Sequence, residues 1–304
     1  MLQEVFYWLF NMSMTASVTG AVVLLLRRLK KVPKRVTVFL WLAPFLRMTV
    51  PFGMGSPYSL MSLISRITTK TVVVYQPTEA VSFSMTNALM LANAYFPVTY
   101  KTAILREVFS VASVVWIVVF SAIALMLAVL YVVTLREMRD ARHLHGNIYV
   151  SEKVLSPAVY GILRPKIVLP PSCEGKDCDM ILLHEKMHIR RADNLWRAVA
   201  FLIVSAHWFN PLGWVFLKQF LADLELSCDE RVLAKLGEDR AQEYAHALLD
   251  SQRGKTVFAS AFGGAKIRTR IENILSFRKM TGFSLAAFAV LVGMMIWVLV
   301  TNAK

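Results

Sequence analysis

Three long apolar runs without a charged side chain limit what this chain can fold into more than any other feature. Residues 5–26, 108–135 and 280–303 contain no Asp, Glu, Lys or Arg. A helix needs about 20 predominantly apolar residues to cross the hydrocarbon core of a bilayer. Each run is long enough, so the sequence predicts an integral membrane protein.

Composition supports this interpretation, because 56% of the residues are hydrophobic and only 18% are charged, whereas soluble domains carry about 25% charged residues. A fourth span is expected at 36–58, although Arg47 lies inside it. That arginine is expected to face protein or to reach the interface, with a functional buried charge as the alternative. The first run lacks a basic leader and a small-residue cleavage site, so we interpret it as an anchor and not as a signal peptide.

A basic segment at 27–35, RRLKKVPKR, sets the expected orientation. It carries six Lys and Arg residues in nine positions, and such residues accumulate on the cytoplasmic side of membrane helices. The N-terminus and a loop at 59–107 are therefore expected outside a plasma membrane that the chain crosses several times. Residues 1–135 form the predicted membrane region, 136–279 a cytoplasmic domain, and 280–304 a last span with a short outer tail.

The predicted cytoplasmic domain has 22 basic and 17 acidic residues. A surface lying against anionic lipid explains this surplus more simply than nucleic acid does. The lipid bilayer is thus an expected partner, and direct nucleic-acid binding is not expected. Cys173, Cys178 and Cys228 all lie in this domain, and an odd number of cysteines in a reducing compartment argues against disulfides.

The pattern of 146–279 predicts both strands and helices. β-Branched residues alternate at 148–150 and 166–169, and helical patterns follow at 222–237 and 240–252, the first ending at Gly237. Residues 198–221 are apolar enough for a span, but Asn210-Pro211 interrupts them. Two shorter helices are expected there, buried in the domain or dipping into the inner leaflet.

The segment LLHEKMHIRR at 182–191 carries the residues of a candidate metal centre. His184 and His188 are four positions apart, so on a helix both imidazoles project from one face. This spacing lets both bind one zinc ion at about 2.0–2.1 Å. Glu185 is the candidate catalytic residue, because a carboxylate there can accept a proton from the attacking water and pass it to the leaving amine.

A catalytic zinc needs a third protein ligand and one open coordination position. Glu225, in ELSCDE, lies 37 residues after His188 and is the predicted third ligand. Asp229 follows one turn later on the same face and is predicted to accept the free N–H of a liganding histidine. A solvated acidic face is the alternative for these two carboxylates.

Four stretches together resemble one family: SPAVYGILRPKIVLP, LLHEKMHIRRADNLW, HWFNPLGW and ELSCDERVL. They are similar to the membrane metallopeptidases that include the BlaR/MecR β-lactam-sensing transducers. The resemblance implies a mainly α membrane protein of about four transmembrane helices, with a cytoplasmic α+β gluzincin-like zinc peptidase domain between the third and last spans. It also implies Zn2+ held by His184, His188 and Glu225, catalysis by Glu185, and Asp229 in the family's acidic motif.

The family's sensors carry an extracellular penicillin-binding domain after the last span. This chain ends at Lys304, so direct β-lactam sensing by it is not expected. The implied activity is hydrolysis of a cytoplasmic protein, such as a transcriptional repressor, or of the chain itself, in signal transduction. ILSFRK beside the last span is a candidate self-cleavage site, with a basic membrane anchor as the simpler alternative. A homo-oligomer is left open.

Two other functions fit the same sequence. A quality-control metalloprotease for membrane proteins uses the same zinc chemistry, whereas a non-catalytic receptor or transducer holds a structural metal. Three protein ligands beside a glutamate favour the open, catalytic kind of site. Lys166–Leu169 is a candidate edge strand for pairing with substrate, or simply a structural strand. Weaker candidates for stabilising an oxyanion are His207, Arg231, Tyr244 and His246.

Overall fold

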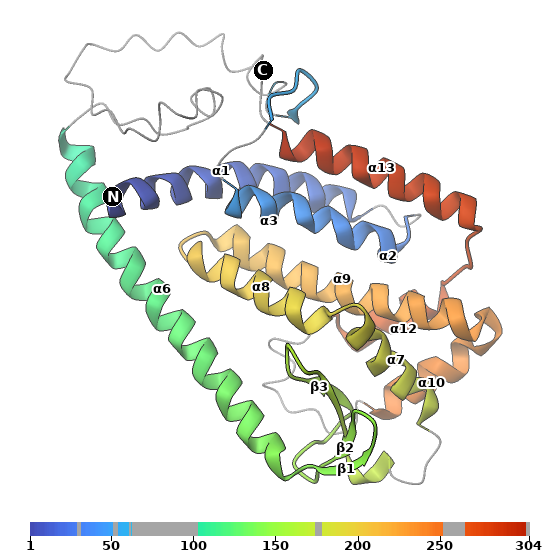
Figure 1. Cartoon of the computed structure of the whole chain (residues 1–304). Helices are drawn as coiled ribbons and strands as arrows, with labels where there is room; N and C mark the ends of the chain where they lie inside the picture. Colours follow the sequence, from blue (N-terminus) through green and yellow to red (C-terminus); the bar gives the residue numbers. More distant parts are fainter. Residues whose placement is uncertain are drawn as a thin grey trace.

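The computed structural model describes residues 1–28, 32–50, 54–60, 62, 103–173, 178–251 and 265–301. Most of them are helical, and one small sheet lies at the end of the molecule opposite both termini (Figure 1). Most of the outer loop predicted at 59–107 falls outside the described residues.

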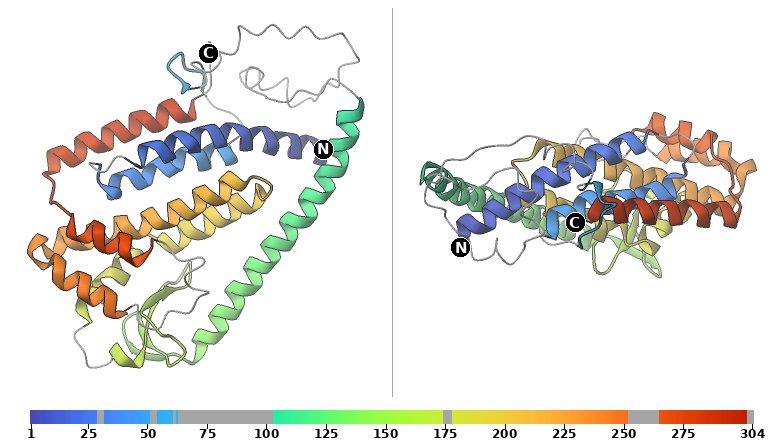
Figure 2. Two further views of the ribbon diagram at one scale, coloured as in Figure 1. Left: turned by 180° about the vertical axis from the view of Figure 1, so that it is seen from behind. Right: turned by 90° about the horizontal axis from the view of Figure 1, so that it is seen from above.

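Three helices in the described part of the chain are long and apolar enough to cross a membrane. They are α1 (Leu2–Leu26), α6 (Ala103–Glu137) and α13 (Gly282–Val300), which coincide with the three uncharged runs. Seen from above, α6 lies at one end of an elongated assembly and α13 toward the other (Figure 2). Only 11% of the apolar window of α6 or of α13 is buried. Apolar surface of this extent is typical of contact with lipid.

The helix predicted across 36–58 is shorter in the structure. Its path consists of α2 (Lys34–Thr37), the 3-10 turn η1 (Val38–Trp41) and α3 (Leu42–Thr49). The chain becomes extended at Val50, directly before Pro51, because the residue before a proline is disfavoured in the α conformation. The fourth full-length span therefore stays a prediction.

Arg47 of α3 faces protein, as one of the two interpretations predicted. Its Nε and Nη2 atoms donate to the carbonyl groups of Leu299 and Thr301 at 3.1 and 2.5 Å. These carbonyls lie at the C-terminal end of α13, where a helix lacks internal donors for its last carbonyls. The arginine thus caps α13 and holds it against α3.

The apolar stretch 198–221 forms two helices, as predicted. These are α8 (Asp193–Ala206) and α9 (Pro211–Leu236). The Asn210 side chain caps α9 by accepting from the N–H of Leu212 at 3.0 Å, and Pro211 occupies the first turn. The separate acidic helix expected at 222–237 is wrong in one respect, because those residues continue α9 without a break. The helix does end at Gly237, whose φ of 98° favours glycine.

Helix α9 connects two hydrophobic cores. Its first half packs with α1, α3, α8 and α13, and its second half packs with α7 (Asp179–Arg190), α10 (Ala241–Ser251) and α12 (Ile267–Leu275). Gly20 of α1 permits the close approach to α9, since a Cβ atom there would lie 2.2 Å from the ring of Phe216. The same helix therefore belongs to the membrane-facing part and to the part that carries the histidine motif.

The sheet has four short strands in the order β1-β2-β4-β3. They are β1 (Arg142–His145), β2 (Ile148–Val150), β3 (Ala158–Tyr160) and β4 (Lys166–Leu169). β4 is parallel to β2 and antiparallel to β3, and it is hydrogen-bonded to both strands. The prediction that Lys166–Leu169 is an edge strand is therefore wrong, because both of its sides are already paired. The edge strand beside β4 is β3.

A buried ion pair fixes α1 to α9. The Asp223 carboxylate is fully buried and accepts from Arg27 Nε at 2.8 and 2.9 Å. It also accepts from Trp41 Nε1 of η1 at 2.8 Å. One carboxylate thus accepts hydrogen bonds from two segments that are nearly 200 positions away in the sequence.

We expect Asp223→Ala to lower the free energy of unfolding by about 1.5–3 kcal/mol, because the partly exposed Arg27 guanidinium and the buried Trp41 indole N–H lose their charged acceptor. The shift is measured by thermal unfolding of the purified protein in detergent. Asp239→Ala removes an exposed carboxylate and is the matched control, with no comparable effect expected. Equal melting temperatures for the two variants would show that the pair contributes no stability.

Candidate metal centre

Two histidines of α7 face one another in a buried position. The Nε2 atoms of His184 and His188 lie 3.0 Å apart, and the ring planes are nearly perpendicular, at 88°. Two ligands of a tetrahedral zinc ion with bonds of about 2.1 Å lie roughly 3.4 Å from each other. The separation of the two nitrogens is close to this value, so both can contact one ion with little movement.

Glu225 of α9 places a carboxylate beside both imidazoles. Its Oε2 is 3.7 Å from His184 Nε2, and its Oε1 is 3.7 Å from His188 Nε2. Burial opposes the charge of Glu225, but the charges of His188 and Arg270 hold its pKa well below the ordinary value. The structure thus brings together the three side chains predicted as ligands. They offer two imidazole nitrogens and one carboxylate, a donor set that fits a divalent cation.

Cys228 is a second donor close to the histidines. Its Sγ and the two imidazoles lie within 4.8 Å of one another, which makes a His-His-Cys group geometrically able to hold a metal. The thiol, however, donates to the backbone carbonyl of His184 at 3.7 Å. Burial raises its pKa well above the ordinary value, so the uncharged thiol is favoured. Because metals bind the thiolate, Glu225 is the better third ligand of the two.

The other nitrogen of His188 is held by Asp193 at the start of α8. Asp193 Oδ2 accepts from His188 Nδ1 at 2.6 Å, while its Oδ1 lies 3.2 Å from Arg191 Nε. The chain reverses direction between α7 and α8 at Ala192, which has a left-handed φ of 53°. This tight turn brings Asp193 back against α7, where it contacts His188. With Nδ1 protonated, the Nε2 lone pair of His188 is free for a metal.

Tyr244 of α10 connects the other nitrogen of His184 to Asp229. The Tyr244 hydroxyl donates to Asp229 Oδ1 at 2.6 Å and lies 2.8 Å from His184 Nδ1. Because its proton points to Asp229, its oxygen accepts from His184 Nδ1–H. His184 Nε2 is then unprotonated, and Arg270 Nη2 lies 3.3 Å from it. Asp229 Oδ1 itself is 3.4 Å from His184 Nδ1. The predicted partnership between Asp229 and a histidine therefore exists in the structure mainly through the tyrosine.

Arg270 of α12 neutralises the same carboxylate. Its Nε and Nη2 atoms donate to the two oxygens of Asp229 at 2.8 and 2.7 Å, a bidentate pair that is almost fully buried. Its Nη1 lies 3.3 Å from Glu225 Oε2. Arg197 of α8 contacts Glu225 Oε1 from the other side. The two arginines hold the Glu225 carboxylate in place between them.

Glu185 is the acidic side chain of the centre that takes part in none of the contacts described above. It forms no hydrogen bond or ion pair with any residue that the structure describes, although it is only 8% exposed. Burial, opposed by His184 and assisted by Glu225, raises its pKa to about 7. A carboxylate with such a pKa is suited to accept and return a proton near neutral pH.

The centre opens into a cavity of about 130 Å³. Both histidines, Glu185, Glu225, Arg197 and Arg270 line it, together with Ala158 and Val159 of the edge strand β3. None of the four oxyanion candidates lines this cavity: His207 bonds to the Met48 carbonyl, Tyr244 lies behind His184, His246 is exposed, and Arg231 lines a different pocket. The cations that line it among the described residues are Arg197 and Arg270.

Sequence reasoning missed Asp193, Arg197 and Arg270, and it assigned Tyr244 a different role. A signal existed for Arg270, because it lies among Ile267, Ile271 and Ile274 on the apolar face of α12, where a charged residue needs a buried partner. Asp193 follows the histidine motif by only five positions. Its contact depends on the reversal at Ala192, which no local pattern predicts.

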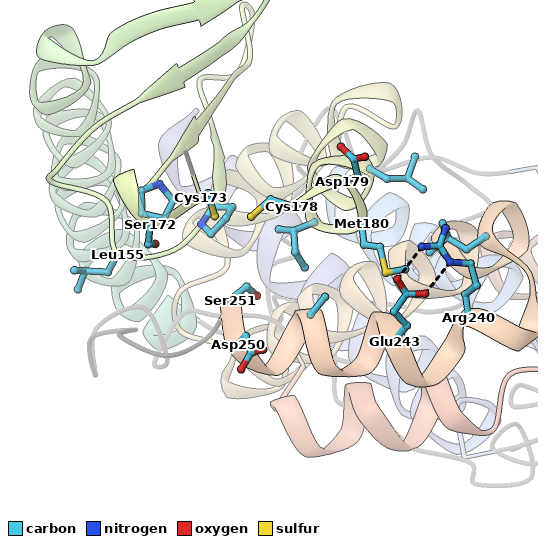
Figure 3. Close-up of a pocket in the computed structure, with 16 residues that line it drawn as sticks. Leu155, Ser172, Cys173, Cys178, Asp179, Met180, Arg240, Glu243, Asp250 and Ser251 are labelled. Atoms are coloured by element: carbon cyan, nitrogen blue, oxygen red, sulfur yellow. Dashed lines mark hydrogen bonds and ion pairs between the residues drawn. The ribbon is translucent and has the colours of Figure 1, made fainter. Parts of the chain in front are cut away.

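A larger cleft of about 880 Å³ adjoins the cavity and shares Pro157, Ile181 and Ser251 with it. Figure 3 shows Cys173 and Cys178 on one wall and the ion pair of Arg240 and Glu243 on another. The three shared residues place the cleft next to the cavity that Glu185 lines. No disulfide joins Cys173, Cys178 and Cys228, all of which lie in the described part of the chain.

Comparison with known proteins connects this geometry to a family. The profile of the family described as BlaR1 peptidase M56 matches residues 7–274. The regulatory protein BlaR1 of Bacillus licheniformis is 32% identical over 146 residues, which cover 44% of this chain and 24% of that protein. The methicillin resistance mecR1 protein of Staphylococcus aureus is 28% identical over 109 residues, or 34% of this chain and 19% of that one.

The matched regions thus span about a quarter or less of these relatives' own length. The family match, in contrast, includes the first candidate span, the histidine motif, the acidic stretch of α9 and Arg270. A match over most of the chain, together with a possible metal-binding group and helices able to cross a membrane, leads to one conclusion: the chain belongs to the BlaR1 peptidase family, M56.

Proposed function

We propose that this chain is an integral-membrane zinc endopeptidase with its active site at His184, His188, Glu225 and Glu185. The observation that carries the proposal is the convergence of two Nε2 atoms and one carboxylate beside Glu185, which forms no hydrogen bond or ion pair with the described residues. A structural zinc site is closed by four protein ligands, whereas a catalytic one keeps a position open. A closed site has no coordination position for a water molecule or substrate, so it needs neither a neighbouring proton acceptor nor a cleft.

His184, His188 and Glu225 would hold the ion, and Asp193 and Tyr244 orient the two imidazoles. When bound, zinc would polarise the peptide carbonyl and activate a water molecule as the nucleophile. Glu185 takes one proton from this water as its oxygen bonds to the carbonyl carbon. The same proton is then returned to the leaving nitrogen as the C–N bond breaks, which regenerates the carboxylate.

The substrate is a polypeptide that reaches the centre along the cleft shown in Figure 3. The named relatives are a regulatory protein and a resistance protein, which supports a role in signal transduction. We propose a cytoplasmic protein of the repressor kind as the substrate, with self-cleavage as a second reaction. The placement of 136–279 in the cytoplasm follows from the basic segment at 27–35 and belongs to the same proposal.

Glu185→Gln is expected to lower peptide-bond hydrolysis by about 10²–10⁴-fold, because the amide cannot accept the proton of water. Metal content should not change, since Glu185 is not a ligand. Cleavage of an unfolded reporter polypeptide by the detergent-purified protein, followed by mass spectrometry, measures the rate. Glu272→Gln alters an exposed glutamate of α12 and serves as the control. An unchanged rate in Glu185→Gln would contradict the mechanism.

The choice of third ligand is tested by comparing Glu225→Ala with Cys228→Ala. We expect the first to weaken zinc binding by more than the roughly 10–100-fold that outer partners contribute, and the second to retain it. Zinc stoichiometry after dialysis against a graded chelator series gives the affinity by elemental analysis. The reverse order would establish the His-His-Cys group as the metal site.

Tyr244→Phe removes the hydroxyl that joins His184 to Asp229 and leaves both ring and packing in place. Zinc affinity should fall by about 10–100-fold, because the tautomer and orientation of His184 are no longer fixed. The same chelator series measures it, and Tyr149→Phe on β2, outside the cavity, is the control. If both variants bind zinc equally well, Tyr244 does not orient His184.

A further inference from the structure

A separate pocket of about 270 Å³ lies between α3 and α8 and is closed at its base by α9. Its walls are apolar, with Leu42 and Phe45 from one side, Val199 and Ile203 from the other, and Phe220 below. This volume is close to the lower end of the roughly 300–1,000 Å³ typical of ligand pockets. The shape and lining suit part of a hydrocarbon chain.

One end of this pocket is cationic. Arg191 and Arg231 line it, and Arg35 is near enough to influence Arg231. The Nε atom of Arg231 is buried without an acceptor among the described residues, and so is that of Arg35. Burial lowers the pKa of Arg231, and the charges of Arg191 and Arg35 lower it further. Arg191 is paired with Asp193 and donates to the Leu224 carbonyl. The unsatisfied donors at this end are therefore the Nε atoms of Arg231 and Arg35.

The acidic residues nearby do not fill this need. Asp223 is paired with Arg27, and the carboxylate of Glu230 accepts from the backbone N–H groups of Lys34 and Arg35 at 2.9 and 3.0 Å. Asp193 lines the pocket but is shared between Arg191 and His188. An added anion with several acceptor oxygens, such as a phosphate group, would engage the arginines by charge-assisted hydrogen bonds.

The rim of the pocket is apolar and exposed. Phe39 is 49% exposed and Trp196 is 47% exposed, and both line the pocket. Tryptophan is enriched where a membrane meets water, and Arg35, from the basic segment, is close enough to Arg231 to affect its pKa. A pocket with an apolar channel, a cationic end and an apolar rim fits an amphiphile taken from the bilayer.

We propose that this pocket binds an anionic phospholipid, with the phosphate at Arg191 and Arg231 and part of one acyl chain between α3 and α8. The remaining chain lies along the exposed apolar face of α8. The site touches the metal centre through Asp193, whose two oxygens contact Arg191 and His188. Lipid binding itself does not depend on the proposed peptidase activity.

The test uses the full chain reconstituted in phosphatidylcholine vesicles that contain a small fraction of photoactivatable phosphatidylglycerol. Labelled peptides are identified by mass spectrometry, with photoactivatable phosphatidylcholine as the neutral probe. We expect peptides from 38–45 and 196–203 to be labelled by phosphatidylglycerol on the order of tenfold more efficiently than by phosphatidylcholine. Both lipids carry a phosphate, but the choline ammonium would bring a second positive charge close to Arg191 and Arg231. Equal labelling by both lipids would overturn the proposal.

Arg231→Gln should remove this preference, whereas Arg190→Gln, which removes an exposed charge next to Arg191 but outside the pocket, should retain it. Val199→Trp fills the channel from a position that is 37% exposed, and should reduce labelling severalfold. Val215→Trp, at a 41% exposed position of α9 outside the lining, is its control. Equal labelling of the pocket variants and their controls by phosphatidylglycerol would contradict the proposed lipid site.

A soluble phosphate compound is the competing source of the same chemistry. Excess glycerol 3-phosphate carries the headgroup without the acyl chains, and we expect it to leave the labelling unchanged. Displacement of the lipid by this compound would show that the arginines bind a free phosphate ester, and the lipid proposal would fail.

Discussion

The geometry of one helix, α9, is the constraint on which the rest of this structure depends. At about 100° per residue, Glu225 and Asp229 project to one face, and Asp223 and Glu230, seven positions apart, project to the opposite face. The first pair meets the histidines of α7 and the arginine of α12. The second pair binds the segment that follows α1. A continuous helix thus serves the metal centre and the membrane-facing helices at the same time.

Charge is distributed unevenly among the buried acids of the centre, and that distribution explains their different roles. Asp229 is neutralised by a bidentate arginine, Asp193 by His188 and Arg191, and Glu225 by two arginines. Each of these carboxylates is thereby held by cationic partners. Glu185 has no such partner among the described residues, and burial raises its pKa to about 7. A buried carboxylate with such a pKa is suited to general acid–base chemistry.

The hairpin of α8 and α9 joins this centre to the membrane-facing core. At its turn, Asn210 donates to Ser13 and Ser17 of α1, and His207 bonds to the Met48 carbonyl of α3. At its other end, Asp193 reaches the metal centre from the first turn of α8. A change in the packing of α1 and α3 therefore has a direct structural route to His188, and the cationic pocket beside α8 lies along that route.

The sequence alone determined the elements whose signal is local. Uncharged runs located α1, α6 and α13, the four-residue spacing placed His184 and His188 on one face, and Asn210-Pro211 and Gly237 marked the limits of α9. The acidic stretch also identified Glu225, because helical spacing selects it together with Asp229. Tertiary structure alone decided that the acidic helix continues α9 and that β4 is an inner strand. It alone brought Asp193, Tyr244, Arg197 and Arg270 to the histidines. Periodicity reports which face a residue occupies on its own helix, whereas these contacts depend on how helices distant in sequence pack together.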